Sequence, residues 1–375
     1  MTPTPKRFLA LDVFRGMTIC FMIIVNTPGN GATSYSPLNH AHWNGFTPTD
    51  LVFPSFLFAL GNAMSFVMPK WPNLKQSKAL WKIFKRTAII FLLGFLMYWF
   101  PFVKRDAANH LIAFPFGDTR VFGVLQRIAL CYAIASLMVY YLKPKTVLII
   151  SIVILFAYWL LLYVLGDPIA PLSLEGNAVL RIDRWLLGEK HLYHGEGVAF
   201  DPEGLLSTLP AIVNVVGGFI AGRYIQQKGK TWEGLSVLLL SGIVLIFLGY
   251  SWDLTFPINK KLWTSSFVLY TVGLDCIILA AVIYMIDFMN KTRWTYFFEV
   301  FGRNPLFIYL LSELAAILMY FLKVDSNTSA YRWMYVNIFS HAGAYLGSLL
   351  FAITFMLFCW IAGYFLDKRK IYIRV

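Results

Sequence analysis

Residues 146–166, TVLIISIVILFAYWLLLYVLG, form an apolar run that contains no charged residue. A transmembrane α-helix needs about 20 mostly apolar residues, because its length must match the hydrocarbon core of a bilayer. Within that core every backbone N–H and C=O group has to be paired inside the segment, which an α-helix achieves. The run therefore predicts a membrane-spanning helix.

The composition of the whole chain agrees with this segment. Of the 375 residues, 58% are hydrophobic and 14% are charged, and the mean hydropathy is +0.64. A soluble domain averages roughly 45–50% apolar and about 25% charged residues, so the composition excludes a soluble globular protein and a disordered chain. We therefore predict an all-α polytopic membrane protein.

The length criterion predicts ten spans, which we assign to one transmembrane domain covering residues 1–375. The longest connection is 167–203, and we expect it on the outer side. The first span is not a cleavable signal peptide, because Asp12 and Arg15 interrupt its apolar run and no small-residue cleavage site follows. The predicted spans are residues 8–27, 48–68, 84–103, 121–141, 146–166, 204–222, 234–251, 266–287, 301–322 and 341–366.

The positive charges indicate an orientation. The net charge is +13, which in a soluble protein would suggest a nucleic-acid partner, but Lys and Arg of membrane proteins collect in cytoplasmic loops. With the N-terminus inside, 20 of these cations fall in cytoplasmic segments and ten in outer ones, while Arg15 and Arg127 fall within spans. We predict that both termini are cytoplasmic and that no nucleic acid is bound.

Cysteine and histidine residues are distributed differently. The four cysteines all lie in predicted spans, where they are expected to be small buried hydrophobes, and no metal-ligand spacing predicts a metal cofactor. The histidines all fall in outer loops or at outer helix ends, which favours proton-transfer or ligand chemistry at the outer face. These histidines are His40, His42, His110, His191, His194 and His341.

Three polar residues share one face of the first predicted span. At 100° per residue, Arg15 lies about 60° from Asp12 around the helix, and Asn26 returns to within about 20° of Arg15. Such a stripe is typical of a helix that lines a path through the protein. The alternative is that Asp12 and Arg15 pair with each other near the membrane interface, and both interpretations stay open.

Arg127 is the other cation within a span. It lies about two turns inside the outer end, so we favour a buried ion pair or a phosphate contact over snorkelling to the interface. Asp275 and Glu313, in the eighth and ninth spans, are possible counter-charges, and the sequence does not choose between them.

The connection 28–47 contains several side chains that can take part in catalysis or binding. It has no Lys or Arg and carries His40, His42 and Trp43, and it leads into Thr47-Pro48-Thr49-Asp50. That ending predicts a helix start, with a capping hydroxyl, a proline at the first position and an acid in the first turn. Asp50 therefore has two interpretations: a helix-start acid, or an acid that orients a histidine as in a catalytic triad.

Six blocks of the sequence, in the same order, resemble the heparan-α-glucosaminide N-acetyltransferase family. The block with the histidines and the tryptophan is the most specific of them. The animal enzyme has a long lumenal region before these blocks, so the resemblance implies a bacterial relative that lacks this N-terminal lumenal domain. The blocks are residues 11–16 with Asn26, 40–54 (HAHWNGFTPTDLVFP), 123–127 (GVLQR), 181–184 (RIDR), 201–204 (DPEG) and 259–265 (NKKLWTS).

The resemblance implies a reaction, a location and part of the site. Members of the family move an acetyl group from cytoplasmic acetyl-CoA to the amine of a glucosamine across the membrane. His40 matches the catalytic histidine of the family and Asn26 an asparagine beside it, and we add Asp50 as a third catalytic candidate. A bacterial inner membrane and an acetyl-CoA co-substrate are expected, and a homodimer is possible within the family.

Two further sets of residues are candidates for binding. The phosphates of CoA need cations or helix N-termini, so Arg15 and Arg127, with their neighbours Asp12 and Gln126, are predicted to bind the co-substrate. At the outer face, aromatic rings can stack on a sugar and acids can bind hydroxyl or ammonium groups, although an interfacial aromatic belt is the alternative for the rings. The candidates for the sugar are Trp43, Asn44, Asp183, Asp201, Glu203, Lys260 and Trp263.

A permease for N-acetylglucosamine or a similar sugar is the competing function. Ten spans, a polar stripe and broken helices also describe transporters. The chain shows no clear internal repeat, and a transporter does not need the loop with its histidines and tryptophan. We therefore favour the acetyltransferase.

Overall fold

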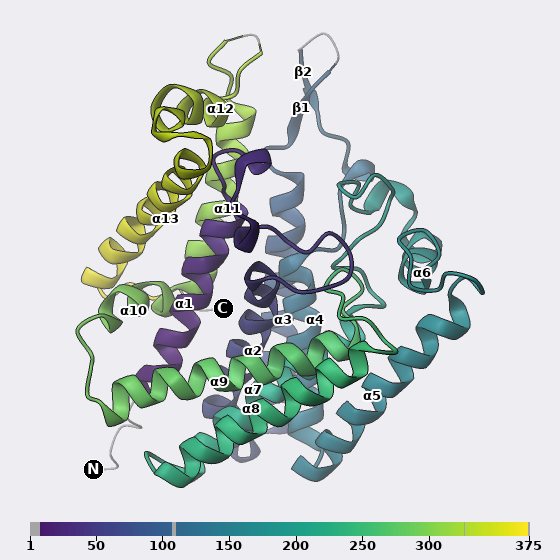
Figure 1. Cartoon of the computed structure of the whole chain (residues 1–375), viewed down its shortest axis with the longest axis vertical. Helices are drawn as coiled ribbons and strands as arrows, with labels where there is room; N and C mark the ends of the chain where they lie inside the picture. Colours follow the sequence, from purple (N-terminus) through teal and green to yellow (C-terminus); the bar gives the residue numbers. More distant parts are fainter. Residues whose placement is uncertain (1–7, 107–109, 326, 374–375) are drawn as a thin grey trace.

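The computed structural model describes residues 8–106, 110–325 and 327–373, and its regular secondary structure is almost entirely helical (Figure 1). The predicted all-α membrane fold is confirmed. One short antiparallel hairpin pairs β1 (Val103–Arg105) with β2 (Leu111–Ala113). The α-helices are α1 (Leu9–Asn26), α2 (Pro48–Val67), α3 (Gln76–Trp99), α4 (Val124–Tyr141), α5 (Pro144–Leu165), α6 (Ala178–Leu187), α7 (Thr208–Lys228), α8 (Trp232–Asp253), α9 (Ser265–Ile283), α10 (Thr295–Arg303), α11 (Pro305–Phe321), α12 (Ala330–Met334) and α13 (Ala344–Lys368).

The number of candidate spans is smaller than the ten predicted. Within the described residues, 8 helices are long and apolar enough to cross a membrane: α1, α2, α4, α5, α7, α8, α9 and α13. The predicted span 84–103 is not among them, because α3 carries Lys78, Lys82, Lys85 and Arg86 in its first half. The predicted span 301–322 corresponds to α10 and α11, which are bent by 82° and make at most a ninth span.

The bend between α10 and α11 has a clear chemical cause. Asn304 interrupts the helix directly before Pro305, and a proline disfavours the helical conformation of the residue that precedes it. The Arg15 guanidinium of α1 donates to the Gly302 carbonyl oxygen (Nε to O, 2.9 Å) and to Asp12 (2.8 Å). Arg15 thus donates to a backbone carbonyl at the C-terminal end of α10 that has no partner within the helix. Of the two interpretations of the polar stripe, the structure shows the pairing of Asp12 with Arg15.

Small residues bring the central helices together. A Cβ on Gly61 in α2 would collide with the Val215 carbonyl of α7, and one on Gly218 in α7 would collide with the Phe58 carbonyl of α2. Transmembrane helices associate through such close packing, since lipid supplies no hydrophobic force between them. The α2–α7 pair, with α4 and α9 packed against it, forms the frame that holds the site described below.

A second apolar cluster supports the segments outside this frame. Tyr158 and Leu162 of α5 pack with Phe200, Phe256 and Leu262, all of which are buried. The Tyr158 hydroxyl also donates to the Leu262 carbonyl. The segment between α8 and α9, which carries Lys260, is therefore held in place by a buried apolar cluster and a hydrogen bond to α5.

Candidate active site

The loop between α1 and α2 is tied down at both ends. The Gly29 amide donates to the Ser348 carbonyl of α13 (3.2 Å), and the Gly45 amide donates to the Ile258 carbonyl (2.8 Å). Gly45 has φ +106°, a conformation that side chains disfavour, so glycine suits this close approach. Asn44 accepts a hydrogen bond from Asn259 (3.1 Å). The loop therefore presents its side chains at defined positions.

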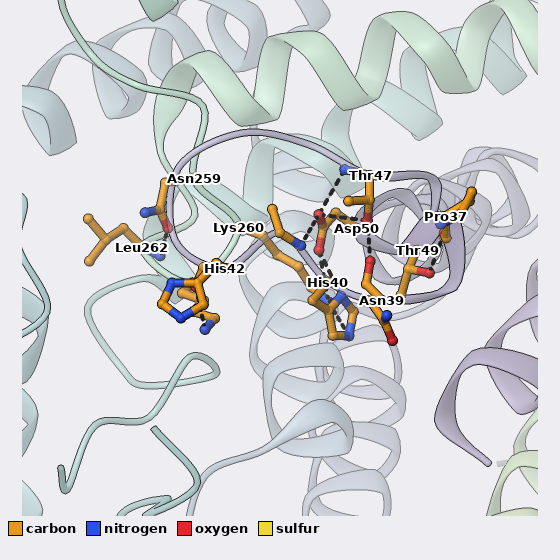
Figure 2. A network of polar contacts seen from close by, with 12 residues as sticks. Pro37, Asn39, His40, His42, Thr47, Thr49, Asp50, Asn259, Lys260 and Leu262 are labelled. Atoms are coloured by element: carbon orange, nitrogen blue, oxygen red, sulfur yellow. Dashed lines mark hydrogen bonds and ion pairs between the residues drawn. The ribbon is translucent and has the colours of Figure 1, made fainter. Parts of the chain in front are cut away.

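Asp50 combines the two roles that the sequence left open. Its Oδ2 atom accepts hydrogen bonds from the Thr47 amide (2.9 Å) and hydroxyl (3.0 Å) and from the Ala41 amide (3.1 Å), which closes the N-terminus of α2. Its Oδ1 atom lies 2.7 Å from Nδ1 of His40 (Figure 2). One carboxylate thus caps the helix and orients the histidine at the same time.

These contacts define the chemistry of His40. With Nδ1 donating its proton to Asp50, the Nε2 atom carries the lone pair, and 44% of the side chain is exposed. The Lys260 Nζ atom lies 3.0 Å from Nδ1 and 3.2 Å from Nε2. A cation nearly equidistant from both nitrogens cannot lie in line with the Nε2 lone pair, so that lone pair is available to a substrate.

Lys260 sits between two carboxylates. Its Nζ atom is 3.8 Å from Oδ1 of Asp50, and Glu203 interacts with it electrostatically. Burial lowers the pKa of Lys260 from its usual value, although both carboxylates oppose this shift. The predicted site residue therefore lies directly beside His40, from a segment far away in the sequence.

The two neighbours of His40 in the loop have different surroundings. The His42 side chain is exposed and points away from His40 (Figure 2), while its backbone carbonyl accepts from Lys261 (2.8 Å). The Trp43 indole donates to the Leu172 carbonyl (2.9 Å) and packs on Phe200, with ring centroids 5.8 Å apart. Trp43 consequently joins the loop to the 167–203 connection and is half-buried.

Arg120 organises a second polar cluster that the sequence analysis missed. Its guanidinium binds Asp201 through two hydrogen bonds (2.8 and 2.6 Å) and Glu203 through one (2.7 Å), between the rings of Tyr98 and Tyr193. Arg120 is one of the ten cations that the charge pattern places in predicted outer segments. The one feature of the sequence that could have indicated this cluster is the excess of acids in the 183–203 segment, because buried acids require a cation.

Arg127 is completely buried, as predicted, but its predicted counter-charges are wrong. It donates to the Gly204 carbonyl (3.1 Å) and to the Ser207 hydroxyl, and its guanidinium lies 4.8 Å from the Trp263 ring centroid. Asp275 instead accepts from Ser55, and Glu313 accepts from Asn26. Among the described residues, no carboxylate lies within ion-pair distance of Arg127.

Several predicted binding residues are not accessible from the protein surface. Trp263 is 1% exposed and donates to Asn214 (3.0 Å), so it cannot stack on a sugar in this structure. Asp183 and Asp201 are buried against backbone amides and Arg120 respectively, which corrects their assignment to sugar binding. Gln126 is fully buried, and its amide has no partner among the described residues. Glu203, Lys260, Trp43 and Asn44 keep partial or full exposure.

The buried Asp183 predicts a pH effect on stability. Burial is the main reason that its pKa is raised, to about 7, whereas the unfolded carboxyl ionises near pH 4. Between these values the folded state binds the extra proton, so stability falls as pH rises, by roughly 1.4 kcal/mol per pH unit. Asp183→Asn removes this pH-dependent contribution to stability. Its melting temperature relative to wild type should be higher at about pH 8 than at about pH 5, and an unchanged difference would contradict the prediction.

Asn26 lies at the end of α1 and contacts α11. Its Nδ2 atom donates to Oε1 of Glu313 (3.3 Å), and its side chain is exposed although α1 is a candidate span. No hydrogen bond joins Asn26 to His40 in the described part of the chain. Asn26 is the last residue of α1, and His40 lies in the segment that connects α1 with α2.

Comparisons with known proteins agree with this arrangement. Residues 7–175 match the family model described as heparan-alpha-glucosaminide N-acetyltransferase, catalytic. The human protein of that name is 26% identical over 100% of this chain, and the mouse protein is 25% identical over 99%. The chain is similar to heparan-alpha-glucosaminide N-acetyltransferase. The predicted resemblance is thereby confirmed, and the chain spans 61% of the length of these two N-acetyltransferases.

The match to the N-acetyltransferase family model divides the site into two parts. It covers Asn26, His40, Asp50 and Arg127, but it ends before Lys260. The whole-length similarity to the human and mouse N-acetyltransferases includes the remaining part. Connecting segments from both parts meet at this place, because the Lys260 ammonium lies 3.0 Å from Nδ1 of His40.

Proposed function

We propose that this protein is a transmembrane N-acetyltransferase that moves an acetyl group from acetyl-CoA to the amine of a glucosamine-type sugar. The observation that carries the proposal is the His40–Asp50 pair, with Nδ1 engaged and Nε2 available. The relationship to heparan-alpha-glucosaminide N-acetyltransferase supports the reaction class. Both relatives carry the name of an acetyltransferase, so a permease is not proposed.

The proposed chemistry begins with the acceptor amine, which must be neutral to attack. In direct transfer, Nε2 of His40 takes a proton from the ammonium, the amine nitrogen attacks the thioester carbonyl carbon, and the C–S bond breaks. In the alternative route, Nε2 itself attacks the thioester and the acetyl-imidazole then passes its acetyl group to the amine. Both routes yield the N-acetylated sugar, the thiol of CoA and one proton.

Negative charge develops on the carbonyl oxygen in both routes. Asn26 carries an amide donor, and the Lys260 ammonium lies 3.0 Å from the His40 ring. A donor aimed at such an oxygen contributes roughly 3 kcal/mol to catalysis, because it is already oriented and partly shielded from water. We assign Asn26 and Lys260 to this role, with Asp50 holding the imidazole in the productive tautomer.

Arg127 and Gln126 remain our candidates for binding an acceptor-rich ligand such as acetyl-CoA, which requires a rearrangement that exposes them, because both side chains are fully buried here. Two nitrogens of the Arg127 guanidinium and both polar atoms of the Gln126 amide have no hydrogen-bond partner among the described residues. Buried donors without partners are rare in proteins and are costly. Arg15 and Asp12 are occupied by each other and by the α10 terminus, so their assignment to CoA has less support.

Proteoliposomes test the activity together with its direction. We propose a bacterial inner membrane with both termini in the cytoplasm, so vesicles in that orientation are loaded with acetyl-CoA and given glucosamine outside. N-acetylglucosamine should appear outside, while free CoA accumulates inside. Uptake of unmodified glucosamine without formation of product would support the permease and reject the transferase.

A further inference from the structure

Four acids near the candidate site differ in their partners. Asp50 contacts His40 and Lys260, and both Asp201 and Glu203 bind Arg120. Burial opposes ionisation of Glu203, but Arg120, Arg127 and Lys260 together lower its pKa. Glu313 is different, because its only described polar partner is the neutral amide of Asn26.

Glu313 belongs to the same polar interior as the other three acids. The Tyr98 hydroxyl accepts from Arg120 (3.3 Å) and lies within electrostatic range of both Glu203 and Glu313. Tyr309, one turn before Glu313 on α11, is likewise within range of Glu203, Arg120 and Glu313. Glu203 in turn interacts electrostatically with Lys260. Glu313 shares its helix face with Tyr309, which is buried, so this face of α11 is directed into the protein.

Glu313 and Asn26 are not fully buried. The Glu313 side chain is half-buried and its partner Asn26 is exposed, so neither is sealed within the helix packing. A partly buried carboxylate without a cation is unfavourable, since burial removes water and nothing replaces its effect. A ligand that brings one positive charge would relieve this cost.

The acceptor of the proposed reaction is such a ligand. An amine on a carbon with electron-withdrawing neighbours has a pKa of about 7.7–8.0, as the α-amino group does, so it arrives mostly as an ammonium ion at neutral pH. The acetylated product is a neutral amide. A carboxylate at this place would bind the substrate in preference to the product.

We propose that Glu313 is the amine-recognition residue, which binds the ammonium group of the acceptor beside Asn26 and selects amino sugars over neutral sugars. This inference rests on the proposed function for the identity of the amine. It adds a specificity determinant on α11 and explains release of the product, which has lost the charge that Glu313 binds.

Equilibrium binding without acetyl-CoA tests the inference directly. Purified wild-type protein should bind glucosamine more tightly than N-acetylglucosamine, whereas Glu313→Gln should bind glucosamine about 30-fold more weakly, with N-acetylglucosamine changed less than about twofold. Asp118→Asn is the matched control, because it removes one exposed outer acid and should leave both affinities unchanged. In a transfer assay, Glu313→Gln should raise KM for glucosamine and leave KM for acetyl-CoA unaltered.

The outcomes separate this inference from the proposed function. Equal affinities of the wild type for the two sugars, or the same glucosamine affinity in Glu313→Gln, would overturn the role of Glu313 even if transfer occurs. Preferential binding that depends on Glu313 without any transfer would support the role of Glu313 and reject the acetyltransferase. If Glu313→Gln has a lowered melting temperature, Glu313→Asp keeps the charge and should retain the preference.

Discussion

His40→Ala is expected to reduce acetyl transfer by about 10³-fold or more in proteoliposomes. The substitution removes the one exposed lone pair that the Asp50 contact prepares, and general acid–base or nucleophilic groups contribute factors of roughly 10²–10⁴. Folding should be maintained, because Asp50 keeps its three hydrogen bonds to the Thr47 and Ala41 groups. The measurement is the initial rate of N-acetylglucosamine formation, with the melting temperature as the folding check.

His42→Ala is the matched control for this prediction. His42 is two residues away, exposed, and its side chain points away from the site, so the rate should stay within about threefold of wild type. A residual rate in His40→Ala close to that of His42→Ala would refute the assignment of His40. The reverse pattern would transfer the role to His42.

The same variants distinguish the two routes of transfer. Incubating wild-type protein with labelled acetyl-CoA and no acceptor should give a hydroxylamine-labile acetyl adduct if His40 attacks the thioester. His40→Ala should then lose the adduct. Absence of any adduct in the wild type, at normal turnover, would leave direct transfer with His40 as the base.

The membrane class could be predicted from the sequence because it depends on composition and on apolar length alone. Segment 146–166 became α5, Pro144–Leu165, within two residues at each end. The bend at Asn304 was not predicted, since hydropathy averages over residues 301–322 and does not register that the chain turns before Pro305. The charged residues in the first half of α3 were averaged out in the same way, and they are the reason that α3 is not among the candidate spans.

The site could be predicted in part. Contacts between residues close in the sequence were predicted, and contacts between distant segments were not. Asp50 lies ten residues from His40, and capping chemistry places both at one helix start, so local rules were enough. The partners of Arg127 and Arg120 depend on how α4, α7 and the 183–203 segment pack, which no local pattern encodes. Trp263 was assigned to the surface because tryptophan is common at membrane interfaces, and its burial under Arg127 is a tertiary effect.

Arg120→Met is expected to lower the free energy of unfolding by about 3–5 kcal/mol. The variant leaves the buried Asp201 carboxylate and its neighbour Glu203 without the guanidinium that both bind. Thermal unfolding in detergent measures the effect. Lys104→Met is the control. The Lys104 Nζ atom lies 3.5 Å from Oδ2 of Asp118 in a solvent-exposed ion pair, and such pairs contribute at most about 1 kcal/mol to stability.

The cause of this loss can be separated from the loss of packing between Tyr98 and Tyr193. If uncompensated charge is responsible, the triple variant Arg120→Met, Asp201→Asn, Glu203→Gln should recover most of the stability, since neutral amides need no cation. Arg120→Met alone should also be less destabilised at acidic pH, where the stranded carboxyls are protonated. If packing is responsible, the triple variant stays as unstable as the single one and the pH has no influence. Recovery by the triple variant would show that Arg120 holds the 201–204 segment in place electrostatically, and with it the Glu203 carboxylate that acts on the charge of Lys260.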